Sequence, residues 1–160
     1  GVGIVGAVND LDELRHLLST SSDRENPGAE EIAELFGRIE RIAVVGLSRD
    51  PEKPARRVPS YLAAKGYDVI PVNPNAERIL GREAYDDVSS VPGRLDMVVV
   101  FRPSEEAGPV VDEIARRPER PVIWLQEGIR ADEEVARARA AGSMAVQDLC
   151  AYKVHRALGG

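Results

Sequence analysis

The chain has 160 residues, a length that suits one domain with a hydrophobic core of its own. Hydrophobic residues make up 43% and charged residues 30%, which is typical of a globular protein and excludes extensive disorder. The formal net charge of -6 argues against a nucleic acid or an anionic membrane as partner, because both require a broad positive surface.

Four absences narrow the class of protein further. No apolar run approaches the roughly 18 residues that span a bilayer, and the N-terminus lacks the basic start of a secretory signal. The chain has one cysteine, so it has no internal disulfide, and no Cys/His cluster is present to hold a metal. We therefore expect a cytoplasmic protein without a metal site.

Residues 1–28 are predicted to be an N-terminal extension with one amphipathic helix. The stretch NDLDELRHLLS repeats leucine at helical spacing, and Asp10 and Glu13 have the spacing of a capping box that would begin the helix. The following TSSDRENPG is rich in turn-forming residues and indicates a linker. An amphipathic helix needs an apolar surface on its own or another chain, so a homo-oligomer is one expected arrangement.

The main domain is predicted to cover residues 29–160 and to begin with a helix from Ala29 to Gly37. From Arg41 onward, short apolar runs alternate with helical patterns, which indicates parallel strands covered by helices on both faces. The predicted strands are 41–47, 68–73, 96–102, 121–126 and 143–148, and the helices are about 59–65, 104–116, 132–141 and 150–158. The fold class is therefore α/β, a doubly wound, five-stranded, mostly parallel Rossmann-type sheet.

Two details of the connections are also predicted. Pro59 is placed in the first turn of its helix, because a proline deeper inside would remove a backbone hydrogen bond. The long link GREAYDDVSSVPG is expected to contain one short helical turn around Asp87 to Val91.

The turn after the first strand resembles a phosphate-binding loop. Gly46 permits a tight turn, and amides exposed at the start of the next helix can receive phosphate oxygens. A dinucleotide fingerprint would read GxGxxG, but its second and third glycines are replaced by Ser48 and Pro51. The acidic residue that would hold an adenosine ribose is missing as well, since Asn73 and Pro74 follow the second strand.

A literal GxGxxG occurs at Gly1, Gly3 and Gly6. No strand precedes it, so it lacks the context that gives this motif its function. We interpret it as a coincidence of sequence.

The loop between Ser48 and Arg57 carries an excess of positive charge in an acidic chain. Its two prolines stiffen it, which lowers the entropy lost when a ligand fixes the loop. Such a loop suits a polyanionic small molecule, although a solvated turn is the plainer interpretation. Its four cations are Arg49, Lys53, Arg56 and Arg57.

A family resemblance is carried by the stretches IAVVGLS, KPARRVPSYL, GYDVIPVNP, VFRPS and WLQEGI, in this order. Together they resemble the small stand-alone CoA-binding proteins of bacteria and archaea. The same fold forms the CoA-binding domain of succinyl-CoA synthetase and of ADP-forming acyl-CoA synthetases. The resemblance covers about residues 29–158 and implies that coenzyme A is the ligand.

The resemblance also implies positions for the ligand. The glycine turn and cationic loop would bind the CoA phosphates through Gly46, Leu47, Ser48, Lys53, Arg56 and Arg57. The turn that would lie against the adenosine is Val72, Asn73 and Pro74. The residues that would wall the pocket are Phe101 and Arg102, and those lining the pantetheine path are Gln126, Gly128 and Ile129.

Cys150 ends a motif that reads DRC in the family and DLC here, with Leu149 in place of the arginine. Because Cys150 stands at an expected helix start, where the helix dipole can lower a thiol pKa, a mixed disulfide with the CoA thiol is one hypothesis. The alternative is a small buried apolar residue. Trp124 is expected in the core, and His155 at the surface.

No catalytic set is recognised in the sequence, so whether the protein is an enzyme stays open and a binding module is favoured. The related synthetases pass a phosphoryl group through a histidine on a separate domain. The first functional hypothesis is a non-catalytic module that binds CoA or an acyl-CoA, as a carrier, a sensor or the partner of an acyl-CoA enzyme. The alternatives are an NAD(P)-binding oxidoreductase or redox sensor, and an interaction protein whose nucleotide site has decayed.

Overall fold

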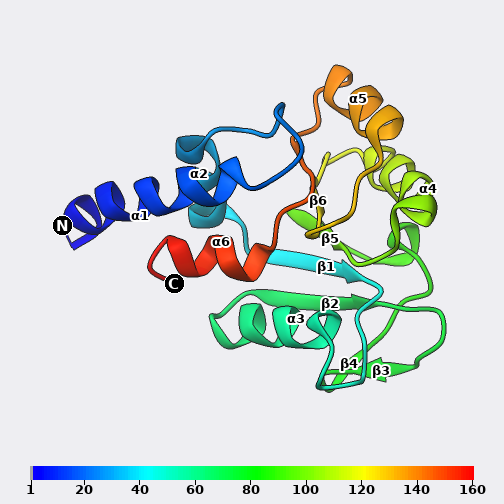
Figure 1. The fold of residues 1–160 in the computed structure, drawn as a ribbon. Helices are drawn as coiled ribbons and strands as arrows, with labels where there is room; N and C mark the ends of the chain where they lie inside the picture. The colour runs from blue at the N-terminus through cyan, green and yellow to red at the C-terminus, as the bar shows by residue number, and fades with distance from the viewer. Residues whose placement is uncertain (1) are drawn as a thin grey trace.

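The computed structural model describes residues 2–160 of the chain, and the side-chain surroundings of residues 11–160. Its centre is a five-stranded parallel sheet in the order β2-β1-β5-β6-β7 (Figure 1). The α/β, doubly wound sheet predicted from the sequence is therefore confirmed. The strands are β1 (Arg41–Val45), β2 (Asp68–Val72), β5 (Met97–Val100), β6 (Val122–Leu125) and β7 (Ala145–Val146).

Helices cover both faces of the sheet. Helices α1 (Val2–Ser19), α2 (Ala29–Arg38), α3 (Pro54–Ala64) and α6 (Ala151–Ala157) pack on one face. Helices α4 (Ser104–Ala115) and α5 (Asp132–Ala140) pack on the other (Figure 1). Within the part of the chain that the structure describes, no helix combines the length and the apolar character needed to cross a membrane.

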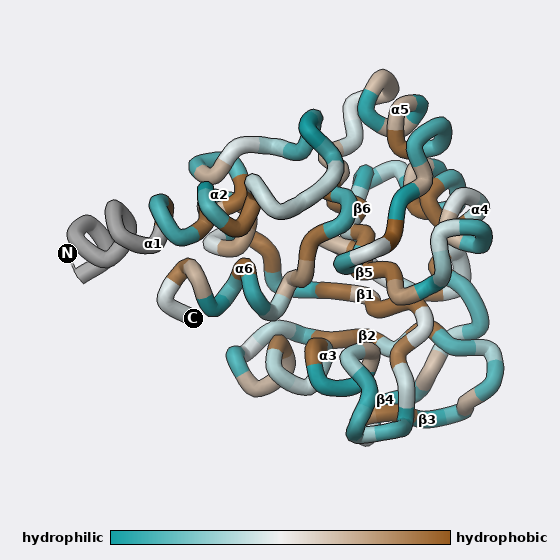
Figure 2. The backbone as a smooth tube through the Cα atoms, viewed as in Figure 1, coloured by the Kyte–Doolittle hydropathy of each residue, from teal (hydrophilic) through white to brown (hydrophobic). Residues whose placement is uncertain are grey.

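The core lies in two layers because successive strand residues point to opposite faces. In β1, Ile42 and Val44 join the layer under α2, α3 and α6, whereas Ala43 and Val45 join the layer under α4 and α5. The hydropathy colouring shows the strands as brown bands inside a shell of more polar helices and loops (Figure 2). Burial on both faces explains why these strands are continuous apolar runs in the sequence.

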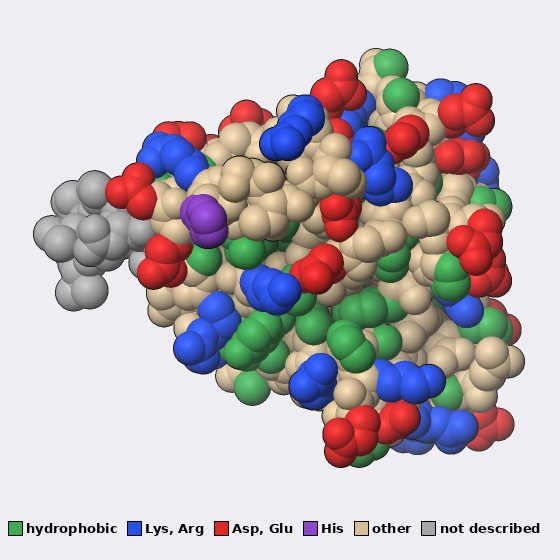
Figure 3. All heavy atoms as spheres, in the orientation of Figure 1, with side chains coloured by type: hydrophobic (Ala, Val, Ile, Leu, Met, Phe, Trp, Pro, Cys, Tyr) green, Lys and Arg blue, Asp and Glu red, His purple; other side chains and the backbone are tan. Residues whose placement is uncertain are grey.

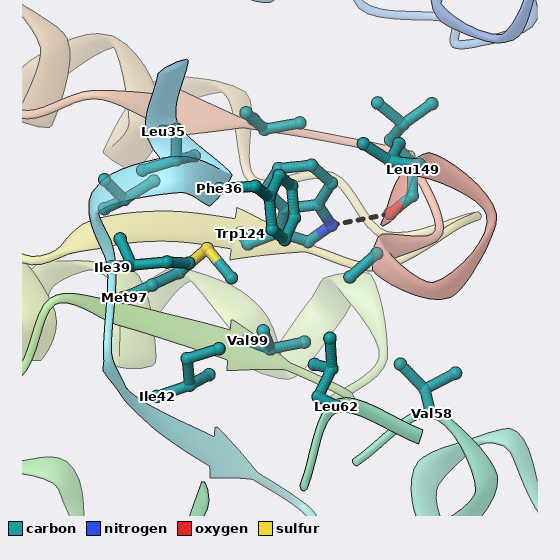
Figure 4. Packing of buried hydrophobic residues seen from close by; sticks show 14 of the residues in the cluster. Leu35, Phe36, Ile39, Ile42, Val58, Leu62, Met97, Val99, Trp124 and Leu149 are labelled. Atoms are coloured by element: carbon teal, nitrogen blue, oxygen red, sulfur yellow. Dashed lines mark hydrogen bonds between the residues drawn. The ribbon is translucent and has the colours of Figure 1, made fainter. Parts of the chain in front are cut away.

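Trp124 lies at the centre of the first layer and is fully buried, as predicted. Its indole Nε1 donates a hydrogen bond of 2.8 Å to the carbonyl oxygen of Leu149, and its ring packs edge-on against Phe36 (Figure 4). Leu149 is itself buried and belongs to the same layer. The residue that replaces the arginine of the DRC motif therefore packs in the core.

The predicted capping box at Asp10 and Glu13 is wrong. Helix α1 begins at Val2, so Asp10 lies inside it. The small and apolar residues before Asp10 continue the helix, and no residue there interrupts it. Gly3 and Gly6 also lie in α1, which agrees with treating the GxGxxG match as a coincidence, whereas Gly1 lies outside the described residues.

The predicted place of Pro59 is also wrong, because α3 begins at Pro54 and Pro59 lies inside the helix. A proline has no N–H, so the carbonyl of Ala55, four residues earlier, receives no helical hydrogen bond from it. This carbonyl instead accepts a hydrogen bond of 3.0 Å from the amide of Ser48. The proline is thus tolerated because the glycine turn after β1 uses the acceptor that it leaves free.

The connection from β2 to β5 contains an unpredicted hairpin of β3 (Arg78–Ile79) and β4 (Arg82–Glu83). The predicted short helical turn is confirmed as the 3-10 helix η1 (Val88–Ser90). After the hairpin, Tyr85 donates its amide to the carbonyl of Pro71 in β2 and accepts from the amide of Asn73. Pro71 is tolerated because β2 is the edge strand of the sheet.

Asn73 joins the loops that follow β1 and β2. Its side-chain Nδ2 donates a 3.0 Å hydrogen bond to the carbonyl of Leu47, and its Oδ1 accepts a 2.8 Å bond from the amide of Asn75. Both ends of the amide are therefore engaged within the protein.

His155 in α6 lies in an aromatic cluster and is not at the surface, contrary to prediction. Its ring is half-buried between the edges of Phe36, Tyr61 and Tyr67, and its Nδ1 is 2.7 Å from the hydroxyl of Tyr61. Burial, and to a lesser degree the nearby Lys65 ammonium, lower the pKa of His155 below its ordinary value. The helix position suggested an exposed ring because the sequence does not show that α2 and α3 meet α6 there.

Replacing Asn73 by alanine should lower the free energy of unfolding by about 1–2 kcal/mol, because two hydrogen bonds are lost. Urea denaturation measures this difference. Asn75→Ala is the matched control, since the exposed Asn75 side chain forms no hydrogen bond with residues 11–160. Equal losses in the two variants would contradict the role of Asn73.

The stability of the protein should fall as the pH is lowered from about 7 to 5.5. The unfolded chain takes up a proton on His155 near pH 6.5, whereas the folded state does so only at lower pH, so protonation favours unfolding in this window. Denaturation of the His155→Gln variant at several pH values should give a flatter profile. The exposed His16 provides the control, and a His16→Gln variant as flat as His155→Gln would refute the assignment.

Candidate functional site

The candidate site lies where the carboxyl ends of β1 and β5 meet. The chain leaves β1 toward β2 on one side, while β5 pairs with β1 on the other, so strand order reverses here. Open parallel sheets bind ligands at such a point. Gly46 begins the turn with a φ of 84°, and a Cβ at this position would lie 3.4 Å from the carbonyl oxygen of Phe101.

A cavity of about 730 Å³ opens at this edge of the sheet, within the size range of small-molecule sites. In the space-filling view, hydrophobic side chains gather between α3 and α6, with cationic side chains around them (Figure 3). One wall of the cavity comes from the start of α3, and the other from the loop after β6 and the start of α6. The lining residues are Lys53, Pro54, Ala55, Arg57, Val58, Phe101, Gln126, Glu127, Ile129, Cys150, Tyr152 and Lys153.

The two walls differ in charge. On the α3 wall, Lys53 and Arg57 are exposed and form no salt bridge with residues 11–160. On the opposite wall, the Lys153 Nζ lies 2.8 Å from the Glu127 carboxylate, which raises the pKa of Lys153. The uncompensated positive charge of the cavity is therefore concentrated at α3.

Most amides of the glycine turn bind within the protein. Gly46 donates its amide to the carbonyl of Val72, and Ser48 donates to Ala55. The Ser48 hydroxyl accepts from the amide of Asp50. Within the described chain, the Ala55 amide in the first turn of α3 has no acceptor, so it is available to an anion together with the side-chain cations.

Gln126 presents an unpaired donor to the cavity. Its side chain is almost fully buried, with 4% of the residue exposed, and its Oε1 accepts a 2.8 Å hydrogen bond from the amide of Ala151. Its Nε2 has no acceptor among residues 11–160, and the residue lines the cavity. An amide donor that opens onto the cavity from an otherwise buried residue is suited to a carbonyl or another acceptor on a ligand.

The loop after β6 is held in place by Asp148. This residue has a φ of 54°, a conformation that non-glycine residues rarely adopt. Its carboxylate accepts hydrogen bonds from the Gly128 amide at 2.6 Å and from both the amide and the hydroxyl of Ser22 at 2.8 Å. Burial raises the pKa of Asp148, but these bonds and the Arg130 charge outweigh it and leave the pKa below its usual value.

The segment that contains Ser22 is fixed by a second network at the end of β7. Asn26 accepts a 2.8 Å hydrogen bond from the Gln147 amide, and the buried Asp23 pairs with Arg139 at 3.1 Å. The Ser21 hydroxyl donates to the Gln147 carbonyl. Residues between α1 and α2 therefore support a wall of the cavity that lies more than a hundred residues away in sequence.

Six of the residues predicted for the site line the cavity together. They are Lys53, Arg57, Phe101, Gln126, Ile129 and Cys150. Cys150 precedes α6 directly and is partly buried, which places it at a helix start as predicted.

The other predicted residues lie around the cavity and do not line it. Leu47 and Val72 are buried in the core, and Asn73 is engaged in the loop contact described above. Arg56 donates to the Ser60 hydroxyl and the Arg49 carbonyl, both at 3.3 Å. The remaining residues outside the lining are Gly46, Ser48, Pro74, Arg102 and Gly128.

Sequence reasoning missed six lining residues, which are Pro54, Ala55, Val58, Glu127, Tyr152 and Lys153. The first three were missed because the start of α3 was placed five residues too late. Glu127 lies between the predicted residues Gln126 and Gly128. Its ion pair with Lys153 shows that the loop after β6 and α6 face each other. The lysine three residues after Cys150 was the available signal for α6, since residues three apart share a helix face.

Comparison with known proteins supports the same ligand class. Residues 40–156 match the family described as CoA binding domain. The chain is 36% identical over 131 residues to the uncharacterized protein YneT of Bacillus subtilis, covering 82% of this chain and 96% of YneT. The solved structure of a hypothetical protein from Pyrococcus horikoshii superposes with a TM-score of 0.78 at 34% identity, covering 82% of this chain and 92% of that one.

A weaker similarity links the chain to an enzyme. It is 28% identical over 95 residues to the ADP-forming acetate–CoA ligase II of Archaeoglobus fulgidus, which is 58% of this chain but only 14% of the ligase. The match to the family spans most of the chain, including every strand of the central sheet and the start of α6. The protein is a member of the CoA binding domain family.

Proposed function

We propose that the protein binds coenzyme A, or an acyl-CoA, in the cavity at the carboxyl ends of the strands and acts as a binding module without turnover of its own. The observation that carries this proposal is the pairing, in one cavity, of two uncompensated cations with an apolar wall. Membership of the CoA binding domain family supports it.

The charge distribution fits the chemistry of CoA. The ligand has a pyrophosphate and a ribose 3'-phosphate at one end and a long, mostly neutral arm at the other. The phosphates need cationic and amide donors, which Lys53, Arg57 and the Ala55 amide offer on the α3 wall. The arm needs apolar contacts with a few polar groups, which Phe101, Ile129 and Gln126 offer.

The end of β2 favours CoA over NAD. In dinucleotide-binding sheets a carboxylate at this point binds the ribose hydroxyls. Here Asn73 follows β2, and both ends of its side-chain amide are engaged by Leu47 and Asn75. We propose that the turn of Asn73 and Pro74 lies against the adenosine without contributing a side-chain donor.

A role beside acyl-CoA enzymes is part of the proposal. The ligase relative contains a similar segment as one seventh of its own length, joined to the rest of that enzyme. We propose that the present chain serves an acyl-CoA enzyme as a carrier or sensor. In the part of α1 from residue 11 onward, Leu14 is buried against the core while several other side chains are exposed, and we propose that this exposed face forms a homo-oligomer contact.

Calorimetric titration should show binding of CoA and weaker binding of dephospho-CoA, NAD, NADP and ATP. The Arg57→Ala variant should bind CoA about tenfold or more weakly, because a hydrogen bond to a charged group contributes about 1.5–3 kcal/mol. Arg116→Ala is the matched control, since this exposed arginine follows α4 and does not line the cavity.

Each alternative gives a different result. Equal affinity for CoA and dephospho-CoA would show that the protein does not contact the 3'-phosphate. Tighter binding of NAD or NADP than of CoA would show that the ligand is a nicotinamide dinucleotide. Absence of binding to all five compounds would favour an interaction protein whose nucleotide site has decayed.

A further inference from the structure

The cavity contains a nucleophile that CoA binding alone does not require. Cys150 is the only cysteine of the chain, is partly buried and lines the cavity at the start of α6. It is a free thiol that packs partly against the hydrophobic core and also lines the cavity.

A hydrogen-bond donor that faces the cavity is anchored next to this cysteine. The Gln126 Oε1 is bound to the amide of Ala151, the residue directly after Cys150, so the Gln126 amide is anchored next to the cysteine. The Gln126 Nε2 lines the same cavity, has no acceptor among residues 11–160, and belongs to a residue that is only 4% exposed. Because this nitrogen is not among the buried atoms that lack a partner, it is accessible from the cavity, where a ligand can accept a hydrogen bond from it.

The third group is the Lys153 ammonium. It lies one helical turn after Cys150, lines the cavity and is held by Glu127 at 2.8 Å. The pKa of Lys153 is raised mainly by its hydrogen bond to Glu127, and a Cys150 thiolate contributes in the same direction. The Lys153 ammonium therefore places a positive charge on the same wall of the cavity as Cys150.

We propose that Cys150 accepts the acyl group of a bound acyl-CoA, with the Gln126 Nε2 donating a hydrogen bond to the thioester carbonyl oxygen. The inference rests on the proposed binding of CoA and goes beyond it. The Cys150 sulfur attacks the carbonyl carbon, a new sulfur–carbon bond forms, and the bond between this carbon and the CoA sulfur breaks. The proton of the Cys150 thiol ends on the CoA thiol, and no oxidant or other reactant is consumed.

The donor distinguishes this reaction from disulfide exchange at the same sulfur. A disulfide has no carbonyl oxygen at the reacting atoms, so the Gln126 Nε2 would not assist exchange with oxidised CoA. A thioester carbonyl becomes more negative as the sulfur attacks it, which is the charge that such a donor stabilises. The substrate class is a thioester of a short acyl group, because the cavity of about 730 Å³ must also hold the CoA arm.

Intact-mass measurement after incubation with acetyl-CoA tests the inference, with a phosphine reductant present to remove disulfides. The wild-type protein should gain the mass of one acetyl group, sensitive to hydroxylamine, and peptide mapping should place it on Cys150. Excess CoA should suppress or reverse the labelling because it competes for the cavity and because the transfer is reversible. The Cys150→Ser variant should gain no hydroxylamine-sensitive acetyl group.

Gln126→Glu is the sharper variant, because it keeps the oxygen that accepts from Ala151 and removes the amide donor. Its labelling rate should fall by about 10²–10³, the loss seen when one donor to a developing oxyanion is removed. Gln126→Met, which lacks both functions, should label as slowly and separates the donor from the added negative charge. The Arg116→Ala control, far from the cavity, should label at the wild-type rate.

The calorimetric titration separates the two proposals. Wild-type protein that binds CoA but gains no acetyl group would overturn acyl transfer and leave CoA binding intact, whereas protein that binds no CoA would overturn both. Labelling of Gln126→Glu and Gln126→Met at the wild-type rate would remove Gln126 from the mechanism. Equal labelling of the urea-unfolded protein would show ordinary thiol reactivity and would also overturn the inference.

Discussion

The structure depends on the close contact between the ends of β1 and β5. Gly46 occupies the left-handed region of backbone conformation, with the Phe101 carbonyl 3.4 Å from the place of its absent Cβ. A larger residue would be strained by its own backbone and would also push against the next strand. This contact fixes the position of the turn after β1 relative to Phe101. The two walls of the cavity lie on either side of Gly46 and Phe101.

The polar groups around the cavity have two separate roles, which are to hold the loops together and to face a ligand. Backbone groups of the turns hold one loop to another, as in the bond from Ser48 to Ala55 that Pro59 makes available. Side chains without internal partners, above all Lys53, Arg57 and the Gln126 Nε2, face the cavity. Stability of the loops and recognition of a ligand therefore rest on different atoms, so changes that abolish binding need not unfold the protein.

The sequence predicted the sheet and the cationic loop because both depend on local patterns. Continuous β-branched runs identified the strands, and the glycine turn located the edge where the cavity opens. The start of α3 was misplaced because Pro59 normally ends or begins a helix, and only the contact between Ser48 and Ala55 shows why it is tolerated. The aromatic surroundings of His155 and the pairing of Glu127 with Lys153 join segments remote in sequence, so no local pattern announces them.

The Asp148 carboxylate, which holds one wall of the cavity, is itself held by a residue outside the part of the chain that matches the family. The family match begins at residue 40, yet the hydroxyl and amide that hold Asp148 belong to Ser22. Trimming the protein to the matched range would leave this carboxylate with the Gly128 amide alone, on a backbone that already lies in a rarely adopted conformation. A shortened chain would keep every strand of the sheet and yet bind its ligand with an altered affinity. The reason is that the Ser22 contact, which helps to fix the loop after β6, would be missing.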